Sequence, residues 1–251
     1  MADVITHYIT AERFIKAHPD VSPQFARGLR FGSQGPDIFF FGATKRSYIF
    51  SCSIHDGDPS ALFAGLAGDI AGETELYRGY ALGVLLHYFL DMTIHPYVGQ
   101  HCAADPRPYE HVYFESAIEM AVFYREYGFE IKDFNYDAAF VRGRDIALVI
   151  LRFWNRRLSQ DVNEGYIRRC LFNMRYLTKM FMRAKAGTVR AARFAGRLIR
   201  NPAAATAHFK TGFDKSVMND ARAPWDSPDG TMHYSVEDML DIALERFTRA
   251  Y

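Results

Sequence analysis

The sequence has little cysteine, no long apolar run and almost no net charge. Its three cysteines, Cys52, Cys102 and Cys170, are odd in number, lie far apart and form no CxxC pair, which predicts that there is no disulfide framework. The longest plainly uncharged apolar stretch, residues 79–90, is too short to span a bilayer. The first residues also lack the apolar core of a signal peptide. We therefore expect a soluble, reduced, cytoplasmic protein.

Charge is distributed unevenly, although the formal net charge is only +1. Residues 165–213 contain eleven Lys or Arg and no Asp or Glu, so the rest of the chain is acidic. The basic helices expected at 165–200 suit peripheral contact with an anionic membrane. They also suit contact with nucleic acid phosphates, or a solvated basic face that binds nothing. No recognisable nucleic-acid-binding motif favours the second interpretation.

Helical periodicity dominates, and alternation typical of strands is hard to find. Hydrophobic residues make up 49% of the 251 residues, which is enough for one sizeable core. We predict a single all-α domain over residues 1–251, a multi-helix bundle with a metal site in its core. Helices are expected at 4–17, 22–30, 60–70, 73–95, 108–127, 137–158, 162–186, 188–200 and 235–249.

Several helix ends are predicted from local chemistry. Ser22 followed by Pro23 is typical of an N-cap and a first helical position. Ser235 with Asp238 resembles an acidic capping box. Pro96 is expected to end the helix before it. The Gly- and Phe-rich segment 31–59 is expected to be a long ordered loop, and the proline-containing segment 201–234 is expected to be mostly irregular.

Histidine and carboxylate residues recur at helical spacing in the first half of the chain. Residues 87–97 read HYFLDMTIHPY, which places His87 and Asp91 at i and i+4, with His95 at i+8 near the same helix face. A second i, i+4 pair, His111 and Glu115, follows on another predicted helix. Helical bundles commonly build metal sites from such side chains on facing helices.

The apolar neighbours of His87 and Asp91 indicate that a charge on Asp91 would be buried and would need compensation. Leucines and aromatic residues surround His87 and Asp91, so an ionised Asp91 requires a cation or several hydrogen bonds. Imidazole and carboxylate together are good ligands for Zn(II). The alternative is that His87 and Asp91 pair with each other, or that Asp91 binds an arginine.

Three further candidates lie upstream, and each has a simple structural interpretation when taken alone. His7 near the N-terminus suits a buried helix histidine. Asp37 ends Gly-Ser-Gln-Gly-Pro-Asp, a turn in which an aspartate bonds its own backbone. His55 suits a solvated loop histidine.

The order of these motifs along the chain resembles that of the bacterial zinc-dependent phospholipase C family: His, GSQGPD, His, HxxxD, His and HxxxE. That family shares an all-α fold and a trinuclear zinc site with fungal single-strand nucleases. The resemblance covers residues 5–119, with a weaker echo in residues 225–228 and the last helix. The closing HxxxE is similar to the phospholipases, whereas the nucleases end in HxxxD. One departure is that this chain begins with Met1 and has no Trp near its start to serve as a zinc ligand.

The resemblance implies two or three Zn(II) ions per chain. Asp37, His55, His87 and Asp91 would hold the first, and Asp91 would bridge to a neighbour. His95, His111 and Glu115 would hold the second, with His101 as an alternative to His95. His7 and Asp91 would contribute to the third.

The expected function is that of a metal-dependent phosphodiester hydrolase acting on a phospholipid or a related soluble phosphate ester. Asp37 is the expected catalytic residue, orienting or deprotonating the attacking water. Phe39, Phe40 and Phe41 either line a substrate pocket or pack in the core. The alternatives are a nuclease on the same metal framework and a helical binding protein in which metal serves only stability.

Overall fold

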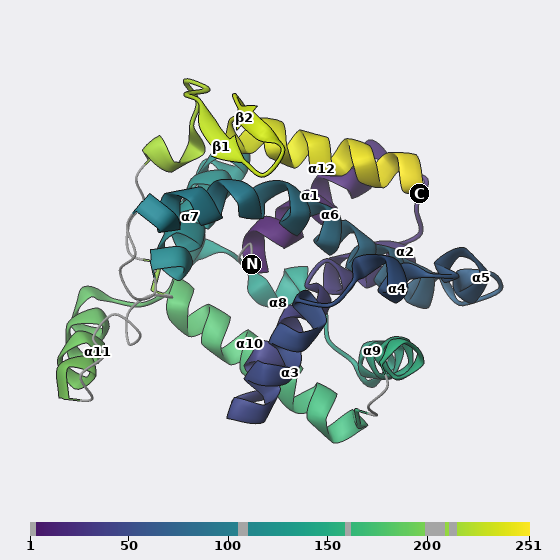
Figure 1. Cartoon of the computed structure of the whole chain (residues 1–251). Helices are drawn as coiled ribbons and strands as arrows, with labels where there is room; N and C mark the ends of the chain where they lie inside the picture. Colours follow the sequence, from purple (N-terminus) through teal and green to yellow (C-terminus); the bar gives the residue numbers. More distant parts are fainter. Residues whose placement is uncertain (1–3, 105–109, 159–161, 199–208, 211–214) are drawn as a thin grey trace. The chain divides into compact units, whose positions relative to one another are not determined.

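The computed structural model describes residues 4–104, 110–158, 162–198, 209–210 and 215–251. The regular secondary structure of these residues is helical apart from one short antiparallel sheet, which confirms the predicted all-α class (Figure 1). The elements are α1 (Val4–Ala17), α2 (Pro23–Gly32), η1 (Gly35–Gly42), α3 (Lys45–His55), α4 (Pro59–Phe63), α5 (Leu66–Ile70), α6 (Glu75–Ala104), α7 (Glu110–Tyr127), η2 (Ile131–Asp133), α8 (Tyr136–Ala139), α9 (Arg144–Arg157), α10 (Glu164–Met182), α11 (Ala186–Leu198), η3 (Lys215–Met218), β1 (Trp225–Ser227), β2 (Gly230–Met232) and α12 (Val236–Ala250), where η marks a 3-10 helix.

The chain forms two compact units, each built from three separate segments. Unit 1 comprises Met1–Ile9, Leu90–Phe134 and Thr178–Arg246, and unit 2 comprises Thr10–Phe89, Asn135–Leu177 and Phe247–Tyr251. The long helix α6 contributes residues 75–89 to unit 2 and residues 90–104 to unit 1. Candidate ligands on this one helix therefore belong to both units.

Glycine allows α2 and α6 to approach closely in unit 2. A Cβ atom added at Gly79 would lie 2.1 Å from the backbone oxygen of Phe25, and one at Gly32 would lie 2.1 Å from that of Tyr80. Such distances leave no room for any larger residue. The close contact fixes the part of α6 that carries His87.

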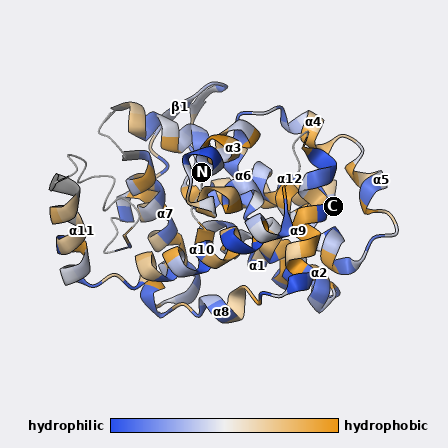
Figure 2. Ribbon diagram, turned by 90° about the horizontal axis from the view of Figure 1, so that it is seen from below, coloured by the Kyte–Doolittle hydropathy of each residue, from blue (hydrophilic) through white to orange (hydrophobic). Residues whose placement is uncertain are grey.

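Aromatic residues fill the rest of the unit 2 core. The indole Nε1 of Trp154 donates to the Tyr80 hydroxyl over 2.8 Å, and both side chains are fully buried. Trp154 comes from α9, where apolar residues recur at helical spacing between exposed charged ones (Figure 2). This amphipathic pattern explains why α9 forms and which face it buries.

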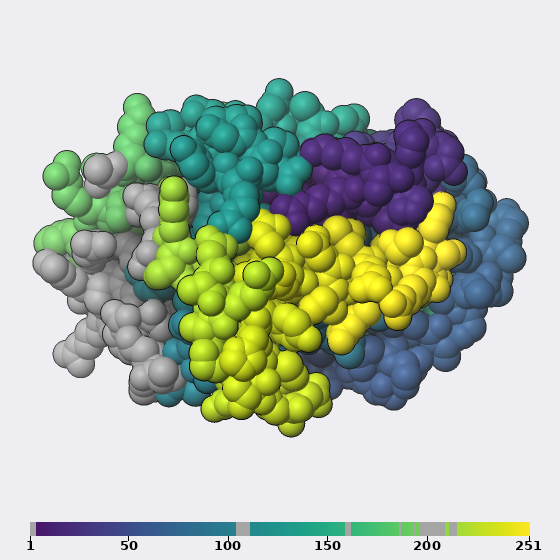
Figure 3. Space-filling view, turned by 90° about the horizontal axis from the view of Figure 1, so that it is seen from above, coloured from purple at the N-terminus to yellow at the C-terminus, as the bar shows by residue number. Residues whose placement is uncertain are grey.

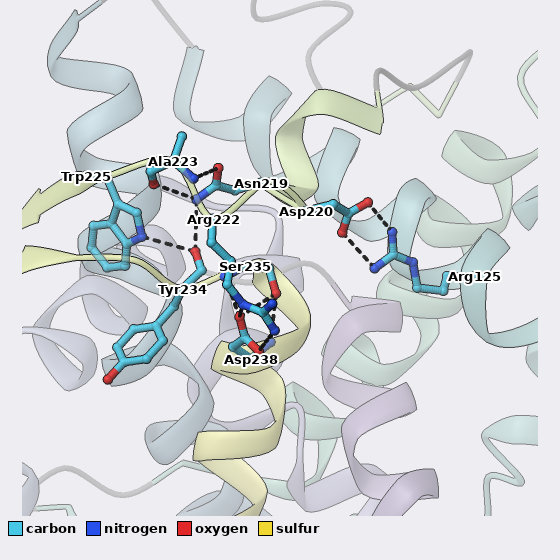
Figure 4. A network of polar contacts seen from close by, with 9 residues as sticks. All are labelled: Arg125, Asn219, Asp220, Arg222, Ala223, Trp225, Tyr234, Ser235 and Asp238. Carbon is cyan, nitrogen blue, oxygen red and sulfur yellow. Dashed lines mark hydrogen bonds and ion pairs between the residues drawn. The ribbon is translucent and has the colours of Figure 1, made fainter.

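In unit 1, polar contacts hold the segment that leads into α12. The Arg125 guanidinium donates to both carboxylate oxygens of Asp220, at 3.0 and 2.7 Å, and Arg222 binds Asp238 in the same paired manner (Figure 4). The indole of Trp225 donates to the backbone oxygen of Tyr234 over 3.2 Å. The β1–β2 hairpin lies at the surface beside the start of α12 (Figure 3).

Both predicted N-terminal caps are confirmed. The Ser22 hydroxyl accepts a hydrogen bond from the backbone N–H of Phe25, with Pro23 as the first residue of α2. At α12, the backbone N–H of Ser235 donates to Asp238 over 2.8 Å, and the N–H of Asp238 donates to the Ser235 hydroxyl over 3.2 Å. These reciprocal bonds form the predicted capping box.

The prediction of a loop over residues 31–59 is wrong, because this segment contains η1 and the eleven-residue helix α3. Thr44 caps α3 through its side chain, which accepts from the N–H of Ser47. The Ser51 hydroxyl donates to the backbone oxygen of Pro36 and ties α3 to η1. The α3 sequence shows little apolar periodicity, so these contacts stabilise it more than an amphipathic stripe does.

The predicted helix end at Pro96 is also wrong. Helix α6 continues through this proline to Ala104. Proline inside a helix costs about 3 kcal/mol, because it removes one hydrogen bond and crowds the preceding turn. Ile94, Tyr97 and Val98 are buried on both sides of it, so burial of this apolar face outweighs the cost.

Two other predicted helices are interrupted. Residues 60–70 form α4 and α5, separated by Gly65 with a φ of +71°. Residues 137–158 are divided by a break at 140–143, where Arg27 donates to the backbone oxygen of Val141. Segment 201–234 is largely irregular in its described part, but it contains η3 and the unpredicted β1–β2 hairpin.

Some predictions lie outside the described residues. These are the start of the helix expected at 108–127, the last two residues of the one expected at 188–200, and residues 201–208 and 211–214 of the irregular segment. In the part of the chain that is described, no helix is both long enough and apolar enough to cross a membrane.

Candidate metal centre

The first group of candidate ligands lies in unit 2. Asp37 comes from η1, His55 is the last residue of α3, and His87 lies on α6. Each offers a nitrogen or carboxylate oxygen, and these atoms all lie within 4.8 Å of one another. His55 Nε2 lies 2.7 Å from Asp37 Oδ1. The neighbouring elements η1 and α3 and the more distant α6 thus bring together three residues that the sequence analysis had singled out.

Gly35 explains how the GSQGPD segment reaches His87. Its φ of +49° lies in the left-handed region, which favours glycine. A Cβ atom at this position would also lie 2.4 Å from the imidazole ring of His87. Any other residue would therefore displace the backbone or the ring, and Asp37 follows two residues later.

Backbone carbonyls orient the histidines. Nδ1 of His87 lies 3.1 Å from the Ser33 oxygen, Nδ1 of His55 lies 2.9 Å from the Ser51 oxygen, and Nδ1 of His95 lies 3.1 Å from the Asp91 oxygen. A carbonyl can only accept, so each Nδ1 carries the hydrogen. This arrangement leaves each Nε2 as the ligand atom and is the usual support for a metal-binding histidine.

The second group lies in unit 1 and contains His95, His111 and Glu115. Their ligand atoms also lie within 4.8 Å of one another. Nε2 of His111 lies 3.0 Å from Glu115 Oε1, and Nε2 of His95 lies 3.6 Å from the same oxygen. One carboxylate oxygen therefore lies near two imidazole nitrogens, and the three residues are those that the resemblance grouped together.

His7 and Asp91 form a third contact, again within unit 1. Nε2 of His7 lies 3.3 Å from Asp91 Oδ1, and the histidine is 1% exposed. Asp91 thus contacts a histidine from α1, the pairing that the resemblance implied. Asp91 follows His87 by four residues on the continuous helix α6, which puts them on one face, one turn apart.

Burial makes the donor set fit a cation. Asp37, Asp91 and Glu115 are 4%, 6% and 6% exposed, respectively. Buried carboxylates need a positive charge, either an imidazolium or a metal ion. An Nε2 atom in the orientation described above, with no proton of its own, repels a carboxylate oxygen, whereas a divalent cation attracts both. Nitrogen and oxygen donors of this kind suit Zn(II).

His101, the alternative to His95, is not in either group. Its ring stacks on Phe114 with centroids 4.3 Å apart, and it meets the edge of Tyr97 at 4.7 Å. Of the phenylalanines, Phe39 is fully buried against Trp154 and Phe50, which is core packing. Phe40 is half-buried, with its ring 5.4 Å from that of His55.

One buried pair escaped the sequence analysis. Glu119 accepts a hydrogen bond from the backbone N–H of Ile5 over 2.5 Å, and Lys210 Nζ lies 2.9 Å from its other oxygen. Lys210 also donates to the Ser116 hydroxyl over 2.7 Å. Burial raises the pKa of Glu119 to about 8 and lowers that of Lys210. The sequence signal was the position of Glu119, four residues after Glu115.

No protein-family model, curated protein or solved structure matches this chain. The functional argument therefore depends on the side-chain groups themselves.

Proposed function

We propose that the chain is a zinc-dependent phosphodiester hydrolase of the phospholipase C type, acting on a phospholipid or a related phosphate ester. The observation that carries the proposal is the grouping of His and carboxylate ligand atoms within 4.8 Å, once in each unit. The alternating order of these residues along the sequence, closing in HxxxE, supports the phospholipase type over the nuclease type.

Asp37, His55 and His87 would hold one zinc, and His95, His111 and Glu115 another. Asp91 and His7 would contribute to a third or bridge to a neighbour. Along α6, His87, Asp91 and His95 follow one another at single helical turns, about 6 Å of rise each. Bound zinc would lower the pKa of water and neutralise phosphate oxygens as negative charge develops.

The chain's own residues have separate roles in this proposal. Asp37, which is held in η1 two residues after Gly35, orients the attacking water and accepts its proton. The water oxygen bonds to phosphorus, the bond from phosphorus to the alcohol oxygen breaks, and the alcohol takes a proton. Phe40 excludes water on the His55 side.

Elemental analysis of the purified, untagged protein tests the metal. We expect two or three zinc ions per chain, and a loss of metal in Asp91→Asn that exceeds the loss in His95→Asn, because Asp91 would serve two ions. His101→Asn is the matched control, since His101 stacks on Phe114 outside the groups. An Asp91→Asn protein with full metal content and activity would refute the proposal.

The substrate is tested separately, with phosphatidylcholine and single-stranded DNA offered to the zinc-loaded protein. Release of a phosphorylated head group supports the phospholipase type, and cleavage of DNA alone favours the nuclease. A protein that binds zinc and gains stability but hydrolyses neither is a metal-stabilised binding protein. Absence of metal, even after reconstitution with zinc, removes the enzymatic interpretation.

A further inference from the structure

A second site lies on α3, away from the candidate ligands. A cavity of about 790 Å³ is lined by α3 and the first turns of α10, both in unit 2. Its volume is within the range of small-molecule sites, which is roughly 300 to 1,000 Å³. Nothing in the proposed hydrolysis uses this cavity.

The cavity is on the opposite side of α3 from His55. Arg46, Phe50 and Ser53 line it and recur at i, i+4 and i+7, which defines one helix face. At 100° per residue, His55 points about 180° from Arg46. A molecule in the cavity is therefore separated from the Asp37, His55 and His87 group by the helix itself.

Two guanidinium groups give the cavity its charge. Arg46 lies at the start of α3 and Arg169 lies on α10, where its guanidinium is 5.4 Å from the ring of Tyr166. No Asp or Glu occurs among the described residues that line the cavity, and none of the described carboxylates is within 4.0 Å of either guanidinium. Both arginines are exposed, so their charges are open to a molecule in the cavity.

The other walls combine apolar surface with hydroxyl groups. Ile49, Phe50, Val162 and Tyr166 supply apolar and aromatic surface. Ile49 is 56% exposed, so a large aliphatic side chain stands open to solvent at the rim. Two cations beside an apolar wall match a molecule that has an anionic head and an apolar body.

We propose that this cavity binds an amphiphilic anion, a molecule with a phosphate or carboxylate head on an alkyl or aromatic body. The head lies between Arg46 and Arg169, whose planar forks suit phosphate and carboxylate oxygens. The body covers Ile49, Phe50 and Tyr166. The site is independent of the metal groups, so it stands or falls separately from the proposed hydrolysis.

Calorimetry with three probes below their micelle concentrations tests the ligand class. Decyl phosphate is expected to bind at one site per chain. Inorganic phosphate has the charge without the chain, and decyltrimethylammonium has the chain with the opposite charge, so each is expected to bind at least about tenfold more weakly. Equal binding of either probe, or no saturable binding of decyl phosphate, overturns the proposal.

Substitutions locate the site. Replacing Arg46 and Arg169 by alanine is expected to weaken decyl phosphate binding by about tenfold each, because two charge-assisted contacts are lost. Ser53→Trp, which fills the cavity from an exposed position, is expected to abolish binding without removing a charge. Arg168→Ala is the matched control, because Arg168 pairs with Glu164 and does not line the cavity. Unchanged binding in the first three variants places the ligand elsewhere and refutes the proposal.

Discussion

Three candidate histidines use the same ring nitrogen in the same way. In His55, His87 and His95, Nδ1 faces a backbone carbonyl, and Nε2 is left for a ligand. For His55 and His95 the carbonyl belongs to the residue four positions earlier on the same helix. The helix backbone therefore selects the tautomer before any metal binds, which lowers the entropy lost on binding.

The Lys210–Glu119 pair gives a test of burial at the scale of single residues. Both side chains are fully buried, so removing one leaves a buried charge without its partner. We expect Lys210→Met to lower the free energy of unfolding by about 3 to 5 kcal/mol above pH 8, where the Glu119 carboxyl is ionised. Urea unfolding measures this change. Lys210→Met with Glu119→Gln should recover most of it, because no buried charge remains.

The pH dependence of the same variant has a definite sign. The pKa of Glu119 is about 8 in the folded protein against 4.5 ordinarily, so the folded state holds a proton that the unfolded state releases. Stability from this group is full below pH 4.5 and is lost as the pH rises through about 8. In the wild type, burial also lowers the pKa of Lys210, and this shift changes stability with pH in the direction opposite to that of Glu119, so the wild type changes less than the variant. The deficit of Lys210→Met should therefore grow from pH 4.5 to 8; a constant deficit contradicts this explanation.

At the scale of elements, α6 carries much of the candidate site, and its two ends are held differently. Residues 75–89 pack against α2 through glycines, whereas residues 90–104 bury Ile94, Tyr97 and Val98 on either side of Pro96. Close glycine packing fixes the helix position and leaves His87 directed at η1. The candidate groups thus depend on contacts made one or two turns away from the ligands.

Two alanine substitutions in α6 separate packing from helix propensity. Gly79→Ala places a methyl group 2.1 Å from the Phe25 oxygen, and we expect it to destabilise the protein by about 1 to 3 kcal/mol or more. Gly99→Ala is the matched control, since no atom lies within 4 Å of the added Cβ. It should raise stability by up to about 1 kcal/mol. Thermal unfolding of both variants decides the matter, and similar shifts in both would argue against close α2–α6 packing.

At the scale of the whole molecule, positive charge is concentrated in one stretch of the sequence, residues 165–213. Arg183 and Lys185 are exposed in the link between α10 and α11, inside the basic stretch 165–213. Attraction to an anionic bilayer is worth about 1 kcal/mol per basic residue near the surface. We propose that this stretch brings the protein to an anionic membrane, where a phospholipid substrate is found.

Vesicle sedimentation tests this proposal. Lys185→Glu should weaken binding to phosphatidylserine vesicles by about tenfold, because one attractive charge becomes repulsive, and added salt should reduce the wild-type binding. Lys132→Glu reverses an exposed charge outside the basic stretch and should have a much smaller effect. Equal losses in both variants, or equal binding to phosphatidylcholine vesicles, would leave the stretch as a solvated basic face.

The sequence by itself determined the helical class, the caps at Ser22 and Ser235, and most helix positions, because these depend on apolar spacing and on hydrogen bonds between near neighbours. Spacing on single helices singled out His87, Asp91, His95, His111 and Glu115 as candidate ligands. Their order along the chain extended that set to residues on other elements.

Tertiary structure decided what local patterns do not contain. Helix α3 forms where a loop was expected, because Thr44 caps its first turn and Ser51 donates a hydrogen bond to Pro36 in η1. Helix α6 passes Pro96 because burial on both sides exceeds the cost of one proline. Lys210 pairs with Glu119 across 91 positions of sequence, a distance over which no periodicity carries information. Long-range packing determines these features, because the contacts that stabilise them join segments that are far apart in the sequence.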